Sequence, residues 1–414
     1  GDWQWFAEQK AQQTDLLSFL ANRYETWTSR LLMEMATWWL ADNLGLFVVL
    51  TLFWAGMLLY SLLDILRLEK ANHRLLLTAA VCLLIPFSIH YSAGFFATTI
   101  NYLWPVAAAL FVISVMFRIA RKQRVSIARY VAASSALSFA IFSEQAAVVL
   151  LTSSVPLLIY IIRQKKLSAK RLVFPISTII FSLGGIINTL LCPGNRIRGV
   201  EAVQGFFAGY FDISLFHKLD IVFCKMFYDI FLQPMTIVVL LCALLVYIAC
   251  KQKNLVAVWL AGIPLVVSGL RLLNELNIVT NEGMGGWNGL SNPDLIFNLF
   301  SKMDYLRDYV LVSYVPKTLI REPLTFVPEL VALAIVGCLV ASIVLIVKDK
   351  CLKAAYLSAL TVAVISYGIM AFTPTIYVSA TRPYLFFYVI VVAVLVSLFI
   401  NRQEIIKKSG KIKL

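Results

Sequence analysis

A carboxylate and a carboxamide interrupt one of the longest apolar stretches of the sequence. Glu144 and Gln145 stand in "FAIFSEQAAVVLL", in the middle of an apolar run from Tyr130 to Ile162. An ionised carboxylate that faces lipid is strongly unfavourable, so acids at such positions usually face a protein interior or a water-filled cavity and take part in function. The sequence therefore predicts that Glu144 faces an enclosed polar space.

A second candidate group follows in "CPGNRIRGVE", residues 192–201. Pro193 and Gly194 predict the end of the preceding helix. Arg196 and Arg198 come directly after it, and guanidinium groups bind phosphate through paired hydrogen bonds, which indicates an anion site. The alternative is a helix end with two arginines that reach toward the membrane surface.

A third candidate group lies in "HYSAGFFATTINYLWP", residues 90–105. Asn101 and Tyr102 stand at the predicted outer end of a helix. An aromatic belt at the membrane boundary accounts for the tyrosine without any function. Asn101 has no such explanation and is the stronger candidate for a binding role.

The composition places these residues in a membrane protein. Of the 414 residues, 60% are hydrophobic and only 14% are charged, and the mean hydropathy is +0.83. Soluble domains are about one quarter charged, and a helix of about 20 apolar residues spans a bilayer. We therefore predict an all-α polytopic integral membrane protein. About eleven spans are expected, at 44–66, 75–92, 103–121, 130–143, 146–162, 172–191, 234–250, 254–270, 325–347, 353–372 and 383–400.

The formal net charge of +14 is distributed unevenly along the chain. Most lysines and arginines lie in alternate connections, such as "RIARKQRVSIAR" and "RQKKLSAKR". The positive-inside rule places these connections and the basic C-terminal tail in the cytoplasm of a cell that carries the chain in its plasma membrane. The charge thus reports topology and gives no case for nucleic-acid binding.

The stretch 130–162 has basic connections at both ends, so it must cross the membrane an even number of times. It is too short for two full spans, and one straight helix of that length would be about 50 Å long. We expect a hairpin of two short helices whose apex lies near residue 145 and points to the outside. Taller helices around such a hairpin would form a recessed cavity with Glu144 on its floor.

Long polar segments on the outer side divide the chain into four regions. Residues 1–43 form a first extracytoplasmic loop with one or two helices along the membrane interface. Residues 44–270 form a transmembrane core that includes the hairpin and an outer loop at 192–233. Residues 271–324 form a large extracytoplasmic loop. Residues 325–414 hold the last spans and the tail.

The metal-binding residue types give no site in the sequence. The seven cysteines form no CxxC pair, and whether Cys192 and Cys224 pair with each other is open. The three histidines, His73, His90 and His217, lack the spacing of metal ligands. We expect no cofactor and no metal.

Several of these motifs together are similar to those of a known enzyme superfamily. "NRYETWTSRLL", "TTINYLWP", "FSEQ" within a helix and "CPGNRIR" resemble bacterial polytopic glycosyltransferases of the C-type (GT-C) superfamily. The resemblance covers most of the first 200 residues. It implies transfer of a sugar from a polyprenyl-phosphate donor to a cell-surface polysaccharide or glycopolymer acceptor on the extracytoplasmic side, with membrane lipid around the chain.

The resemblance assigns the catalytic acid, and the other polar residues of the outer side supply the remaining expected roles. The family carries a catalytic acid just after its first membrane helix, and Asp2 matches it, which implies a helix ahead of Gly1 and twelve spans. Asp2 is then the general base and Glu144 a second acid. The donor phosphate would be held by Arg196, Arg198 and Arg382. Substrate binding would involve Arg23, Asn101, Tyr102, Gln145 and Asn195.

Two other functions stay open. One is a wall-polysaccharide polymerase or ligase, which would also have outer arginines and a large outer loop and would release a pyrophosphate carrier. The other is a flippase or transporter of lipid-linked sugars. A transporter would place polar residues at mid-membrane in broken helices, whereas the charges of this chain cluster toward one face, which favours the transferase.

Overall fold

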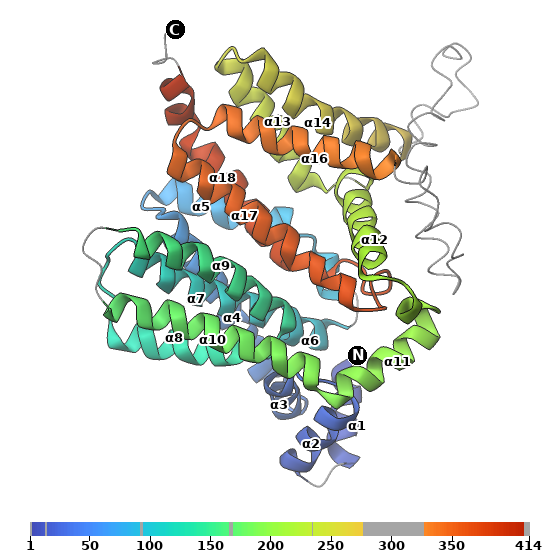
Figure 1. The fold of residues 1–414 in the computed structure, drawn as a ribbon. Helices are drawn as coiled ribbons and strands as arrows, with labels where there is room; N and C mark the ends of the chain where they lie inside the picture. Colours follow the sequence, from blue (N-terminus) through green and yellow to red (C-terminus); the bar gives the residue numbers. More distant parts are fainter. Residues whose placement is uncertain are drawn as a thin grey trace. The chain divides into compact units, whose positions relative to one another are not determined.

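The computed structural model describes residues 2–12, 15–91, 94–164, 169–233, 235–275 and 327–409, and every regular element among them is helical (Figure 1). The predicted outer loop 271–324 lies outside the described residues apart from 271–275. The elements of the first part are α1 Asp2–Gln12, α2 Leu16–Thr26, α3 Leu31–Leu40, α4 Leu44–Leu66, α5 Ala71–Leu84, η1 Phe87–Tyr91, α6 Phe95–Thr98, η2 Thr99–Leu103, α7 Trp104–Ala120, α8 Ile127–Ala140, α9 Glu144–Ile162, α10 Lys170–Leu191 and α11 Pro193–Phe206. The remaining elements are η3 Tyr210–Asp212, α12 Leu215–Phe227, η4 Tyr228–Leu232, α13 Thr236–Lys251, α14 Leu255–Glu275, α16 Val327–Ile346, α17 Lys350–Gly368, η6 Ile369–Phe372, η7 Arg382–Tyr384 and α18 Leu385–Ser409.

The all-helical membrane fold is confirmed, whereas the number of spans is not. Among the described residues, seven helices are long and apolar enough to cross a membrane, or eight if the pair Leu215–Leu232 and Thr236–Lys251, bent by 69°, is one span. Each of the eleven predicted apolar runs does contain a helix. Several are too short to qualify: α5 has 14 residues because Ile85, which precedes Pro86, is held in an extended conformation, and α8 also has 14 residues.

The described chain divides into two compact units. Unit 1 contains Gly1–Glu201, Ser358–Ile369 and Ser379–Ala393. Its central element is α7, which packs against α4, α8 and α9, while α10 packs against α9 (Figure 1). Nearly every residue of α7 is buried, and its run Ala107–Ala109 lets neighbouring helices approach closely.

Unit 2 contains Ala202–Leu357, Met370–Val378 and Val394–Leu414. Its helices α13, α14 and α16 pack against one another, and α12 contacts α16. The side chain of Gln252, at the end of α13, donates hydrogen bonds to the carbonyls of Ile346 and Ile405. This amide ties the end of α13 to α16 and α18.

The helix break that the sequence predicts beside Glu144 is present. Helix α8 ends at Ala140, and α9 begins at Glu144 after Ser143, whose hydroxyl accepts a hydrogen bond from the amide of Ala146. A serine at this position stabilises a helix start. The first turn of α9 therefore has a defined position, with Glu144 at its beginning.

Helix α10 packs closely against this break. A Cβ atom built on Gly185 would lie 2.3 Å from the carbonyl oxygen of Ile141, whereas one built on Gly184 would meet nothing within 4 Å. Glycine at 185 is therefore required for the close approach of α10 to the break.

This packing gives the first prediction. Gly185→Ala should destabilise unit 1 by about 1–3 kcal/mol because backbone has to move. Gly184→Ala, one residue away on the exposed side, should be neutral or stabilising by up to about 1 kcal/mol because alanine favours the helix. Unfolding of the detergent-solubilised protein followed by circular dichroism measures both. Equal stability of the two variants would contradict the packing.

Candidate functional site

The acid at the start of α9 forms an ion pair with an arginine from the N-terminal helices. Arg30 Nε donates to Glu144 Oε2 at 2.9 Å, and Arg30 Nη2 donates to Glu144 Oε1. Their side chains are 17% and 29% exposed, so the pair is only partly hydrated. A bidentate contact of this kind fixes the orientation of both groups. Glu144 is thus kept ionised by a guanidinium and has access to solvent.

Asn101 and Tyr102, in the π-helical turn η2, also contact Arg30. Arg30 Nη1 donates to Asn101 Oδ1 at 3.4 Å, and the guanidinium lies 5.6 Å from the centre of the Tyr102 ring. Burial by itself would lower the pKa of Arg30, but Glu144 and Tyr102 outweigh it and raise that pKa above its usual value. Arg30 therefore stays charged at neutral pH.

Arg198 is the second cation of this group. It lies on α11, stacks 5.7 Å from the ring of Trp27, and donates from Nη2 to Asn195 Oδ1 at 3.3 Å. Burial and the nearby Arg30 lower the pKa of Arg198, against the attraction of Glu144. No ion pair involves Arg198 among the described residues. We name Arg30, Glu144 and Arg198 the Arg–Glu–Arg cluster.

The start of α11 is fitted closely to the turn between α2 and α3. A Cβ on Gly194 would lie 2.2 Å from the backbone nitrogen of Trp27. Asn195 Nδ2 donates to Ser29 Oγ at 3.0 Å and to the carbonyl of Thr189 at 2.9 Å. The sequence "CPGN" therefore joins α10 to the same turn that carries Arg30, which brings Arg198 and Arg30 together.

Asp2 caps a helix and does not contact Glu144 directly. Its carboxylate accepts hydrogen bonds from the amides of Phe96, at 3.3 Å, and Ala97, at 2.8 Å. The chain approaches through Gly94, whose φ of +90° and lack of a Cβ leave room for Asp2. Carboxylates are favourable at helix N-termini, so this position stabilises the helix Phe95–Ala120.

A chain of hydrogen bonds links the two acids. The amide of Ala97 donates to Asp2, and its carbonyl accepts from Asn101 Nδ2 at 2.9 Å. Asn101 Oδ1 then accepts from Arg30, which is paired with Glu144. Asn101 lies in the π-helical turn η2, and such turns occur frequently at functional sites. Asp2 and Glu144 are therefore linked through one helical turn, from Ala97 to Asn101.

Other predicted site residues have different surroundings. Gln145 is 6% exposed, and its amide nitrogen donates to the carbonyls of Ser366 and Pro383. Those bonds brace α9 against α17 and η7 and leave no amide hydrogen for a substrate. Arg196 is exposed to solvent. Arg382 has a buried Nε without a hydrogen-bond partner, and no bond in the described chain joins it to the cluster.

Arg23 is paired with an acid that the sequence did not single out as its partner. Its Nε and Nη2 donate to Glu34 at 2.8 and 3.2 Å, between α2 and α3. Both side chains are largely buried, at 14% and 6% exposure. The pair fixes the angle between the two helices and so positions the turn that carries Arg30.

Arg30 and Trp27 are the site residues that the sequence analysis did not assign. The sequence does indicate that Glu144 needs a cation beside it, because an unpaired carboxylate in an apolar helix is strongly unfavourable. Sequence could not choose among the outer arginines because the partners are 114 residues apart. Trp27 belonged to a tryptophan-rich segment that an interfacial helix explains equally well.

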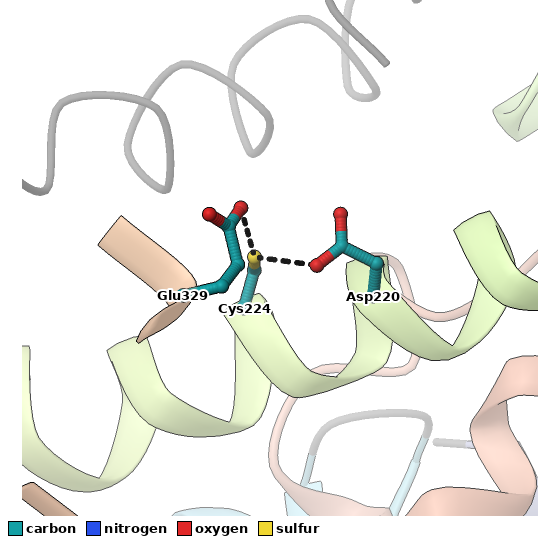
Figure 2. A group of neighbouring side chains, drawn as sticks. All are labelled: Asp220, Cys224 and Glu329. Carbon is teal, nitrogen blue, oxygen red and sulfur yellow. Dashed lines mark hydrogen bonds between the residues drawn. The ribbon is translucent and has the colours of Figure 1, made fainter. Parts of the chain in front are cut away.

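A separate group of possible metal ligands lies in unit 2. Cys224 Sγ lies 3.5 Å from Glu329 Oε1 and 3.8 Å from Asp220 Oδ1, and one ligand atom from each residue lies within 4.8 Å of the others (Figure 2). Asp220 and Cys224 are one turn apart on α12, and Glu329 is in the first turn of α16. Zinc accepts thiolate and carboxylate ligands but takes four in structural sites. Cys192 and Cys224 form no disulfide with each other in the described part of the chain.

The fit of α11 against the Trp27 turn gives the second prediction. Gly194→Ala should displace α11 and separate Arg198 from Arg30, because a methyl group would overlap the backbone at Trp27. Gly199→Ala, on the same helix, meets nothing within 4 Å and is the control. Unfolding of the detergent-solubilised protein, followed by circular dichroism, compares the two variants, and Gly194→Ala should be the less stable. Equal stability of the two variants would contradict the required close approach.

Comparison of the chain with protein-family models, with curated proteins and with solved structures finds no match in any of the three. The case for a function therefore comes from the chemistry of the Arg–Glu–Arg cluster and its neighbours.

Proposed function

We propose that the protein is an inverting glycosyltransferase that moves a sugar from a polyprenyl-phosphate donor to a polysaccharide or glycopolymer acceptor on the extracytoplasmic side of the membrane. The observation that carries the proposal is Arg198. It is a partly buried cation without a carboxylate of its own, beside a second arginine whose charge Glu144 already neutralises. Such a site attracts an anion.

The charge of the cluster selects the kind of anion. Two guanidiniums and one carboxylate leave one positive charge. A polyprenyl-phosphate sugar is a phosphodiester with one negative charge, which this excess balances. As the sugar leaves, negative charge grows on the phosphate oxygen, and the cluster attracts the leaving phosphate more strongly than the intact donor. Interactions that strengthen in this way accelerate the reaction.

The two acids supply the proton chemistry. An acceptor hydroxyl is a weak nucleophile, so a base has to remove its proton as it attacks the anomeric carbon. In the proposed step the proton passes to Asp2, the new glycosidic bond forms, and the bond from the anomeric carbon to the phosphate oxygen breaks. Glu144 holds Arg30 in place and accepts hydrogen bonds from the sugar. A single displacement inverts the anomeric centre.

The third prediction tests the anion site. With purified protein and a polyprenyl-phosphate sugar, Arg198→Ala should lower the turnover rate by about 10²-fold, as loss of one charge-stabilising donor does in other enzymes. Arg198→Lys should recover part of it because the charge returns without the planar fork. Arg196→Ala is the matched control, two residues away and exposed, and should keep full activity.

Other results of that assay would reassign the protein. Equal losses in Arg196→Ala and Arg198→Ala would point to a general surface-charge effect. Release of a polyprenyl pyrophosphate would identify a polymerase or ligase. Movement of the lipid-linked sugar across vesicles without turnover would identify a flippase.

The fourth prediction ranks the two acids. Asp2→Asn keeps the shape and one of the two hydrogen bonds of the helix cap but loses basicity, and should lower the rate by about 10²–10⁴-fold. Glu144→Gln should lower it less. It should also reduce stability, because Arg30 is left partly buried without its counter-charge. Rates at equal amounts of folded protein separate the two effects. The reverse ranking would make Glu144 the base.

A further inference from the structure

Arginines from α7 and α8 converge on Asp64 of α4, at the end of unit 1 where α4 and α7 finish and α8 begins. Arg118 donates from Nε and Nη2 to the two oxygens of Asp64, at 2.7 and 2.5 Å. Arg129 Nη2, from the first turn of α8, donates to Asp64 Oδ2 at 3.2 Å. One carboxylate therefore serves two guanidinium groups.

A third arginine at this end pairs with backbone oxygens. Arg121 donates from Nη1 and Nη2 to the carbonyls of Asp64 and Ile65, in the last turn of α4. Burial and the neighbouring Arg67 and Arg118 lower the pKa of Arg121 to about 10. The fold thus brings cations together against their mutual repulsion. We name Asp64, Arg118, Arg121 and Arg129 the Asp64 cluster.

The cluster has more positive charge than its own acid can balance. Three guanidiniums and one carboxylate leave an excess of two charges. Arg129 is held in a fixed position between the rings of Tyr60 and Phe111, at 5.1 and 5.9 Å, and its side chain is only 14% exposed. Its Nε is buried and has no hydrogen-bond partner. The N–H of Arg129 Nε is therefore a buried donor for which the described chain supplies no acceptor.

Exposed apolar side chains lie beside these arginines. Tyr60 on α4 is 46% exposed, and Ile127 and Val131 on α8 are 83% and 61% exposed. In a chain with several membrane-spanning helices, apolar side chains of this kind face acyl chains. An occupant of the site therefore needs an anionic group for the arginines and hydrocarbon for its neighbours. Basic sites between transmembrane helices at the cytoplasmic face bind anionic lipid headgroups in this way.

We propose that the Asp64 cluster binds the phosphate of an anionic phospholipid in the leaflet that meets the end of α4, α7 and α8. The positive-inside rule makes this the inner leaflet. The lipid phosphate accepts hydrogen bonds from Arg129 and Arg118, and its acyl chains lie along Tyr60 and Val131. The site is independent of the Arg–Glu–Arg cluster and of the function proposed for it.

The fifth prediction is a binding experiment on the full chain in a neutral detergent. Phosphatidylglycerol should bind, by native mass spectrometry, and raise the midpoint of thermal unfolding, whereas zwitterionic phosphatidylcholine should do neither. Arg129→Gln should weaken phosphatidylglycerol binding about tenfold, as expected for loss of a charge-assisted contact. Arg124→Gln removes an exposed arginine of the same connection and should leave binding within about twofold.

Defined outcomes would overturn the proposal. Equal binding of the two lipids would exclude a charge-selective site, and equal losses in Arg124→Gln and Arg129→Gln would indicate general surface attraction. Stabilisation by inorganic phosphate at the same concentration would identify a site for the free ion. If Arg129→Gln does not fold, Arg129→Lys replaces it, and unchanged binding in that variant would show that the guanidinium fork is not used.

Discussion

An ionised carboxylate at the start of an apolar helix needs a cation beside it, and the rest of unit 1 is arranged to supply one. Glu144 begins α9, and its partner Arg30 comes from the turn between α2 and α3. The N-terminal helices must therefore dock onto the membrane helices for the acid to remain charged. The close contact at Gly194 and the bonds of Asn195 to Ser29 and Thr189 are the means of that docking.

The same constraint explains the position of Asp2. Helix α1 brings Asp2 to the amides of Phe96 and Ala97, and Asn101, one turn later, contacts Arg30. The hydrogen bonds that connect the two acids thus run along one helical turn and through Arg30. Because the two carboxylates are held on one scaffold, they can serve a single reaction with different roles.

The sequence predicts the features that depend on local pattern and misses those that depend on pairing across the chain. Apolar runs locate the helices, and the charges that flank 130–162 predict the break beside Glu144. Pro86 lies inside the predicted span 75–92 and explains why α5 ends at Leu84. Pro193 predicts the end of the preceding helix, but in the structure it is also the first residue of α11. Arg196 and Arg198 therefore both lie on a helix. Residues two apart on a helix point about 200° apart, so only one of the two arginines faces Arg30.

Two arginine clusters with one carboxylate each stand at opposite ends of the same helix. Asn101, which contacts Arg30, and Arg118, which contacts Asp64, both lie on Phe95–Ala120. At 1.5 Å per residue the helix carries them about 25 Å apart, slightly less than the thickness of a bilayer's hydrocarbon core. A shift of this helix along the membrane normal would carry one cluster into lipid, so the two clusters together fix its depth. In a chain that spans the bilayer, the two clusters therefore lie near opposite boundaries of the hydrocarbon core, where long guanidinium side chains can reach the phosphates of either leaflet.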